Sequence, residues 1–236
     1  MGNFDGNGKT IKNLTITNIA PDSDGYVYAG LFGVTEGIDA NNENWIKNLT
    51  IENVNINLDG HIVAAAIAYP YYTNLENITV KGNVSIKGGN YTSGVLAYTR
   101  RLVNAKNIAI EANEGSVIEG SATIGGVISD IQTNGGLIAN YSNFAASGLT
   151  VKGNSNVGGI SGIISEQTLD GASVRNVEIV CDNATKGIVS GALGGESIIK
   201  NIVKENVKGA DKVIGAMYEK GTDVVVDGDV YMEATD

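Results

Sequence analysis

A block of small residues returns along this chain at intervals of about 31 residues. The blocks read AGLFGV, AAAIAY, SGVLAY, GGVISD, GGISGI, SGALGG and IGAMYE. Their first small residues are Gly30, Ala65, Gly94, Gly126, Gly159, Gly191 and Gly215, which gives steps of 35, 29, 32, 33, 32 and 24 residues. Seven units at a near-constant period predict a repeat architecture, in which stacked neighbours bury one continuous core.

The segments between these blocks decide the type of repeat. They alternate apolar and polar residues after an asparagine, as in IKNLTITNI from Ile11, IKNLTIENVNI from Ile46 and LENITVKGNVSI from Leu75. Alternation with period two, rich in Ile, Val and Leu, is typical of strands, and no window shows a helical period. Ankyrin, tetratricopeptide and HEAT repeats are therefore excluded, and the frame of leucine-rich repeats is missing. The sequence predicts an all-β fold, a parallel β-solenoid.

We expect one domain over residues 1–236, with seven or eight coils whose strands stack about 4.8 Å apart. Met1–Ala20 forms the first coil in this prediction, and Thr222–Asp236 forms the last rung and cap. The stretch DIQTNGGLIANYSNFAA from Asp130 is expected to be a loop or partial extra coil.

An asparagine recurs at one position of the repeat and predicts a structural ladder at a corner. Its amide can bond corner backbone groups and the asparagine of the next coil. At the fifth unit this position is Gly148, so we expect the ladder to break there. The predicted members are Asn13, Asn48, Asn77, Asn107, Asn176 and Asn201.

Charge and composition limit the possible partners and locations. The net charge of −10 opposes binding to nucleic acid and to anionic membranes, and no apolar stretch is long enough to span a bilayer. The lone Cys181 ends an apolar run and is expected to be an inert buried thiol. The first residues show no signal peptide, and we expect an export signal or anchor to precede this sequence.

Catalytic and metal sites are not evident in the pattern. Aligned units place Asp130 beside Tyr98 and Val34, with no second acidic residue in register, and His61 has no carboxylate partner. The acidic turns PDSDG, with Asp22 and Asp24, and VDGDV, with Asp227 and Asp229, are too poor in oxygen ligands for calcium. We therefore expect no catalytic residues, no metal and no cofactor.

One cluster is a candidate ligand-binding site. Aligning HIVAAAIAYPYY with NYTSGVLAYTRR places Tyr69 on Tyr98, Tyr71 on Arg100 and Tyr72 on Arg101. Aromatic faces beside guanidinium groups can hold sugar rings and acidic glycans. The same residues also suit a structural role, in which stacked tyrosines and arginine stems cover the side of the solenoid.

The opening FDGNGKTIKNLTI, followed by Gly30-Leu31-Phe32-Gly33, resembles the GLUG-motif family of bacterial secreted and surface proteins. Although DGNGKT suggests a phosphate-binding loop, Asn3 stands where that motif needs glycine. The resemblance covers the first two units well and implies a right-handed parallel β-helix, an extracellular or cell-envelope location and a mostly non-enzymatic role.

The predicted function is therefore an adhesin-like module that contacts polysaccharide or glycoprotein. Two alternatives stay open at this point: a polysaccharide-cleaving lyase or hydrolase of the same fold, and a structural spacer within a longer surface protein.

Overall fold

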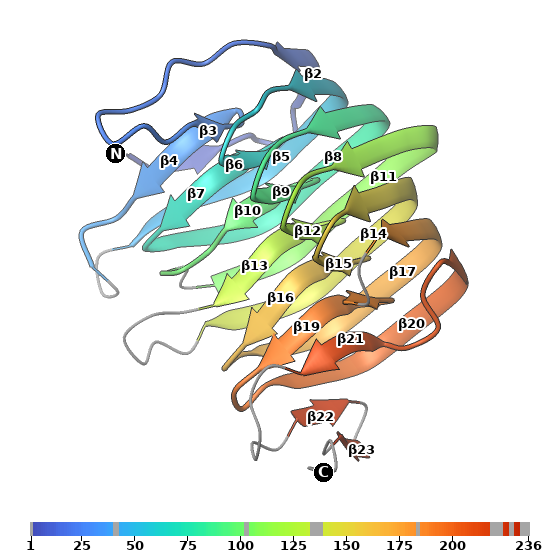
Figure 1. Cartoon of the computed structure of the whole chain (residues 1–236). Helices are drawn as coiled ribbons and strands as arrows, with labels where there is room; N and C mark the ends of the chain where they lie inside the picture. The colour runs from blue at the N-terminus through green and yellow to red at the C-terminus, as the bar shows by residue number, and fades with distance from the viewer. Residues whose placement is uncertain are drawn as a thin grey trace.

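The chain folds into stacked coils made of three β-sheets (Figure 1). The computed structural model describes residues 2–39, 43–101, 104–132, 139–182, 185–217, 224–226 and 229–231. This described part contains strands and turns but no helix, and its sheets are parallel except for one terminal pair. The prediction of an all-β parallel solenoid is confirmed.

The longest sheet has ten strands and bends around the side of the molecule. Its strands are β1 (Phe4–Asp5), β2 (Thr10–Ile16), β5 (Asn44–Asn57), β8 (Thr73–Lys87), β11 (Asn104–Glu119), β14 (Asn140–Gly153), β17 (Thr168–Cys181), β20 (Ile198–Lys208), β22 (Val224–Val226) and β23 (Asp229–Tyr231). Strand β22 adds to β20 in parallel, and β23 pairs with β22 in the antiparallel direction. The stack therefore ends in a short antiparallel pair.

Two shorter sheets complete each coil. The six-stranded sheet contains β3 (Tyr28–Ala29), β6 (Ile62–Ala64), β9 (Tyr91–Ser93), β12 (Thr123–Gly125), β15 (Asn156–Gly158) and β18 (Lys186–Gly187). The seven-stranded sheet contains β4 (Phe32–Glu36), β7 (Ile67–Tyr71), β10 (Leu96–Tyr98), β13 (Ile128–Gln132), β16 (Ser161–Ser165), β19 (Ser190–Gly194) and β21 (Ile214–Met217). One strand from each sheet makes a full turn, and the described residues form about six turns.

The core consists of side chains that repeat from coil to coil along the axis. In one column Leu49, Ile78, Ile108 and Phe144 are neighbours in register, and each is at most 2% exposed. Burying each such side chain contributes about 1.5–3 kcal/mol relative to leaving it in water. Because every coil supplies only one layer, this stabilisation depends on a neighbour above and below.

Two left-handed residues bend each long strand so that it follows the core. In β5 these are Asn48, with φ of 55°, and Asn53, with φ of 59°. Asparagine and glycine are the residues that enter this backbone region at least cost. The first bend is formed by Asn48, Asn77, Asn107, Asn143, Gly171 and Asn201, and the second by Asn13, Asn53, Gly82, Gly115, Gly148, Asn176 and Asn206.

The prediction of a single asparagine ladder is wrong, because the predicted members divide between the two bends. At the first bend Asn77 donates to Asn48 at 3.0 Å, Asn107 to Asn77 at 2.8 Å and Asn143 to Asn107 at 3.0 Å. Asn201 belongs to the same bend but donates to the Asp170 carboxylate, since its neighbour there is Gly171.

Asn13 and Asn176 lie at the second bend. Asn53 donates to Asn13 at 3.2 Å, and Asn206 donates to Asn176 at 2.8 Å. The left-handed residues of this bend in the intervening coils are Gly82, Gly115 and Gly148, which have no side-chain amide, so they interrupt the second ladder. The first ladder continues through Asn143 and is interrupted at Gly171.

The error has a simple cause in the first coil. IKNLTI at Ile11 repeats the letters of IKNLTI at Ile46, yet β2 pairs with the second half of β5, Thr10 opposite Thr50. The first half of β5 pairs instead with β1, where Phe4 lies opposite Ile46. A similar shift affects the sixth unit. There Ile188, and not the predicted Gly191, lies next to Gly159 of the preceding coil.

We expect Asn107→Ala to lower the free energy of unfolding by about 2 kcal/mol, because it combines a strained left-handed alanine with the loss of two ladder hydrogen bonds. Asn107→Gly removes the same hydrogen bonds without the strain and should cost about 1 kcal/mol less. Urea unfolding of the three proteins measures this difference. If both variants lose the same free energy of unfolding, the left-handed backbone at position 107 does not destabilise alanine relative to glycine.

Charged side chains alternate in sign along three outer columns. Asp5 pairs with Lys47 at 3.6 Å, and Glu52 pairs with Lys12 at 3.4 Å and with Lys81 at 3.8 Å. The columns in register are Asp5, Lys47, Glu76 and Lys106; Lys12, Glu52, Lys81 and Glu111; and Lys87, Glu119 and Lys152. Each exposed pair contributes little alone, but opposite charges always face each other in these columns.

Several sequence predictions fall outside the described residues. Most of the predicted C-terminal rung, Thr222–Asp236, lies there apart from β22 and β23, and so does Asp227 of the second acidic turn. The tip of the predicted loop after Asp130, residues 133–138, lies there as well. Its flanks, up to Gln132 and from Asn140, are the regular strands β13 and β14.

Candidate binding surface

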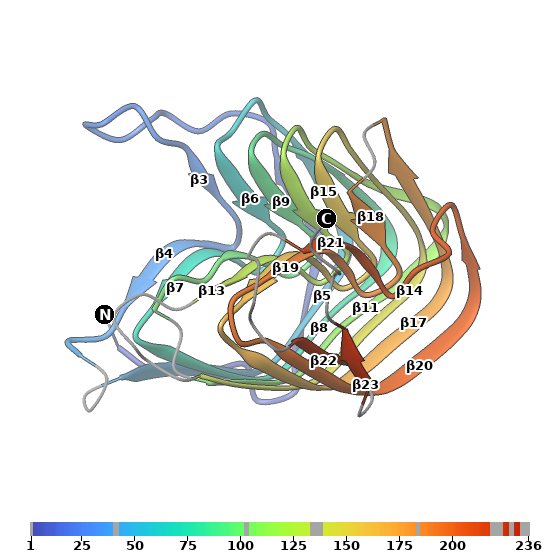
Figure 2. The ribbon, with the colours of Figure 1, turned by 60° about the horizontal axis from the view of Figure 1, so that its bottom comes forward.

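The outer faces of the two short sheets meet at a concave angle. Figure 2 shows β3, β6 and β9 diverging from β4 and β7 on this side of the molecule. Small residues line the bottom of the angle: Ala64, Ala68 and Ala97 form a second hydrophobic cluster with Ile62. Because these side chains are short, larger aromatic rings can pack over them from both sheets.

A group of six partly buried tyrosines fills this angle, and we call it the aromatic belt. Tyr69 is at its centre, with ring centroids 5.9 Å from Tyr28, 5.8 Å from Tyr71 and 5.3 Å from Tyr98. The belt comprises Tyr28, Tyr69, Tyr71, Tyr72, Tyr91 and Tyr98, which come from three consecutive coils. Burial raises the pKa of the Tyr69, Tyr91 and Tyr98 hydroxyls, so these groups stay neutral hydrogen-bonding groups at physiological pH.

Two arginines lie on the belt. The Arg100 guanidinium lies 4.8 Å from the centre of the Tyr98 ring, and Arg101 lies 5.3 Å from Tyr71 and 5.7 Å from Tyr72. Arg101 also donates a hydrogen bond of 2.7 Å to the Tyr72 hydroxyl. Cation–π contacts of this kind contribute about 0.5–1 kcal/mol at exposed sites and hold the guanidinium planes against the rings.

The structure brings all six predicted site residues together, with one change of register. Tyr69 and Tyr98 are neighbours on adjacent coils, as the alignment predicted. Tyr71, however, pairs with Arg101 and not with Arg100, and the Tyr72 amide bonds the Arg101 carbonyl. The predicted pairing of Tyr72 with Arg101 in register is thus also wrong. The chain has one more residue between Tyr98 and Arg101 than between Tyr69 and Tyr71, so both arginines are shifted by one position relative to the alignment.

Sequence reasoning missed Tyr28 and Tyr91. Both lie on the six-stranded sheet, so they reach the belt from the other wall of the angle. The signal was an aromatic residue directly before the small-residue block, in YAGLFG and YTSGVLAY. Beyond them, Tyr26 is 47% exposed and contacts both Tyr28 and His61, which extends the aromatic surface at its N-terminal end.

Asp130 lies behind the belt, in register with Tyr98 on the next coil. The carboxylate is 1% exposed, and its Oδ1 atom has no hydrogen-bond partner. Burial raises the pKa of Asp130 to about 7, although the nearby Arg100 charge opposes the change. Because its surroundings exclude water, this group cannot serve as an exposed ligand-binding carboxylate.

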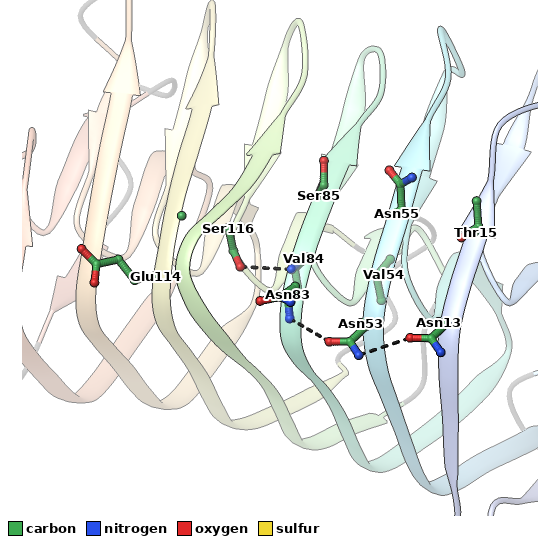
Figure 3. A pocket seen from close by; sticks show the side chains of 11 residues that line it. Asn13, Thr15, Asn53, Val54, Asn55, Asn83, Val84, Ser85, Glu114 and Ser116 are labelled. Atoms are coloured by element: carbon green, nitrogen blue, oxygen red, sulfur yellow. Dashed lines mark hydrogen bonds between the residues drawn. The ribbon is translucent and has the colours of Figure 1, made fainter.

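A hollow follows the second bend of the long strands (Figure 3). Its volume is about 400 Å³, and Asn13, Asn53 and Asn83 line it beside Thr15, Asn55 and Ser85. At one end Glu114 belongs to a widening of β11, where the register shifts between Ala112 and Val117. This hollow offers amides and hydroxyls but no aromatic ring, so the belt is the stronger candidate for binding a ring-shaped ligand.

Other predicted features have structural roles. The Asp22 carboxylate accepts hydrogen bonds from the backbone amides of Asp24 and Tyr26, which explains the acidic turn without calcium. The Cys181 thiol is partly buried and donates to the Ser155 carbonyl. Among the described residues no three His, Cys, Asp or Glu side chains are grouped as metal ligands would be, and no helix there could cross a membrane.

Comparison of the chain with protein-family models, curated protein sequences and solved structures finds no match in any of the three.

Proposed function

We propose that this protein is a non-enzymatic, adhesin-like binding module that contacts glycans of a polysaccharide or glycoprotein through the aromatic belt. The observation that carries the proposal is the continuous tyrosine surface across three coils, with two guanidinium groups on it. Aromatic faces pack against the apolar faces of sugar rings, and hydroxyl and guanidinium groups supply hydrogen bonds at their edges. A surface that repeats every coil, about 4.8 Å apart, suits an extended ligand.

The wider setting is part of the same proposal. We place the protein at the cell surface or outside the cell, related to GLUG-motif proteins. In this proposal the coils wind in the right-handed sense, which connections between parallel strands strongly favour. With partial turns at both ends, the number of coils is seven or eight. The seven strands of one sheet support this number. The net charge of −10 supports a partner other than nucleic acid.

Binding to immobilised polysaccharides tests the proposal. The double variant Tyr71→Ala/Arg100→Ala should lose at least about tenfold in affinity, because it removes one ring and one charge from the belt. Thr79→Ala, on the long sheet away from the belt, is the matched control and should bind normally. Thermal unfolding followed by circular dichroism verifies that both variants fold.

The structural alternative predicts a different result. If the belt only covers the solenoid, the double variant loses stability but binds every polysaccharide as the unmodified protein does. That result would remove the belt as the binding surface.

A further inference from the structure

The two arginines of the belt, unlike Arg175, take part in no ion pair of the described residues. Six ion pairs join side chains in the described part, and Arg175 takes part in one of them with Glu205 at 3.5 Å. Neither Arg100 nor Arg101 takes part in any. In a protein with 26 acidic residues and a net charge of −10, the two adjacent guanidinium groups thus lie outside every ion pair of the described residues.

Both guanidinium groups act on the same point of the surface. Tyr69 lies near enough to Arg100 and Arg101 that each positive charge lowers the pKa of its hydroxyl, against the larger effect of burial. The rings of Tyr98, Tyr71 and Tyr72 hold the two side chains in place. A guanidinium group has five N–H donors, and the one hydrogen bond from Arg101 to Tyr72 leaves most of its donors for a ligand.

The acidic groups around the belt are placed unevenly. Asp130 is the carboxylate near Arg100, and it is buried behind the rings. At the opposite end, Asp22 accepts a hydrogen bond from the Tyr26 amide, and the Tyr26 ring contacts Tyr28. Burial is the main cause that raises the pKa of Tyr28, and the charges of Asp22 and Asp24 add to it. Glu36 is in register with Tyr71 on the side away from Arg101. The belt therefore has a positive end at the arginines and a negative end on the coil that carries Tyr28 and Glu36.

We propose that Arg100 and Arg101 bind an oxyanion, a carboxylate or a sulfate, carried by the glycan whose rings lie on the belt. This inference rests on the proposed function and adds to it the ligand class and its direction. Guanidinium groups match carboxylate and sulfate oxygens with paired, charge-assisted hydrogen bonds. The charged sugar lies at the arginine end, and neutral sugars extend toward Tyr28, because Asp22 and Asp24 repel a second anion there.

Isothermal titration of the full 236-residue chain with four hexasaccharides tests the inference. They are an oligogalacturonate, its fully methyl-esterified form, a sulfated galactan and the same galactan without sulfate. We expect the charged members to bind at least about tenfold more tightly than their neutral counterparts, with an advantage that falls as salt is raised. The oligogalacturonate and the sulfated galactan distinguish a carboxylate from a sulfate as the preferred group.

Three variants locate the effect. Arg101→Gln should weaken binding of the charged hexasaccharides several-fold more than binding of the neutral ones and so remove most of the preference, whereas Arg101→Lys should keep part of it. Arg175→Gln removes an arginine away from the belt and should keep all of it. Equal affinity for charged and neutral hexasaccharides, or an equal loss in Arg175→Gln, would overturn the inference and leave the proposed function standing. Failure to bind any hexasaccharide would overturn both.

Discussion

Replacing Gly126 by alanine should lower the free energy of unfolding by about 3 kcal/mol or more, since overpacking against rigid backbone is among the costlier core changes. A Cβ atom at Gly126 would lie 2.1 Å from the Gly159 carbonyl oxygen of the next coil. Gly94 and Gly159 have the same relation to their own neighbours, at 2.3 Å from a backbone oxygen. The alanine can fit only if the coils move apart, and that would weaken every hydrogen bond between them.

Thermal unfolding measures this effect. For a chain of this length, about 3 kcal/mol corresponds to a fall of about 6–12 °C in the midpoint. Gly2→Ala is the matched control, because a Cβ atom at Gly2 would have no other atom within 4 Å, and its midpoint should not change. A shift in the midpoint below about 1 °C for Gly126→Ala would show that the glycines at positions 94, 126 and 159 do not set the spacing of the coils.

Replacing Asp130 by asparagine should stabilise the protein at pH 8 by up to about 4 kcal/mol, which is the free energy of a pKa difference of about three units. The folded protein raises the pKa of this carboxyl from 3.8 to about 7. Below about pH 4 the group is protonated in both states and costs nothing. Between about pH 4 and 7 the unfolded chain ionises first, so the free energy of unfolding falls as pH rises, and above about pH 7 the loss is constant.

Urea unfolding at pH 4 and pH 8 tests this sign. The difference between Asp130→Asn and the unmodified protein should be close to zero at pH 4 and large at pH 8. Asp170→Asn is the opposite control, because hydrogen bonds from Asn201 and Lys200 lower the pKa of Asp170 and make its ionised form favourable. An identical difference at both pH values for Asp130→Asn would mean that its carboxyl does not titrate abnormally in the folded protein.

The class of fold could be predicted from the sequence because its signals are local. Period-two alternation and corner residues such as Asn48 and Asn53 depend on backbone preferences within a few residues. Register was harder, since IKNLTI occurs at both Ile11 and Ile46 but occupies different bends. Both bends ask for the same left-handed residue, and only the pairing of whole strands distinguishes them.

The belt was found in part for the same reason. Tyr69 and Tyr98 share one repeat position, so alignment of units brought them together. Tyr28 and Tyr91 occupy another position and meet them only because two sheets diverge at a concave angle. The extra residue at Arg100 changes the pairing by one position, and no repeat pattern contains that information.

The alternating charge columns limit how such a solenoid can change its length. If the single coil that carries β5 were lost, Lys12 would face Lys81, and Asp5 would face Glu76 in the neighbouring column. Loss or gain of two coils would keep opposite signs in contact. In the N-terminal half of this protein the charge pattern therefore repeats every two coils, although the backbone repeats with every coil, and only an even number of inserted or deleted coils preserves the facing of opposite charges.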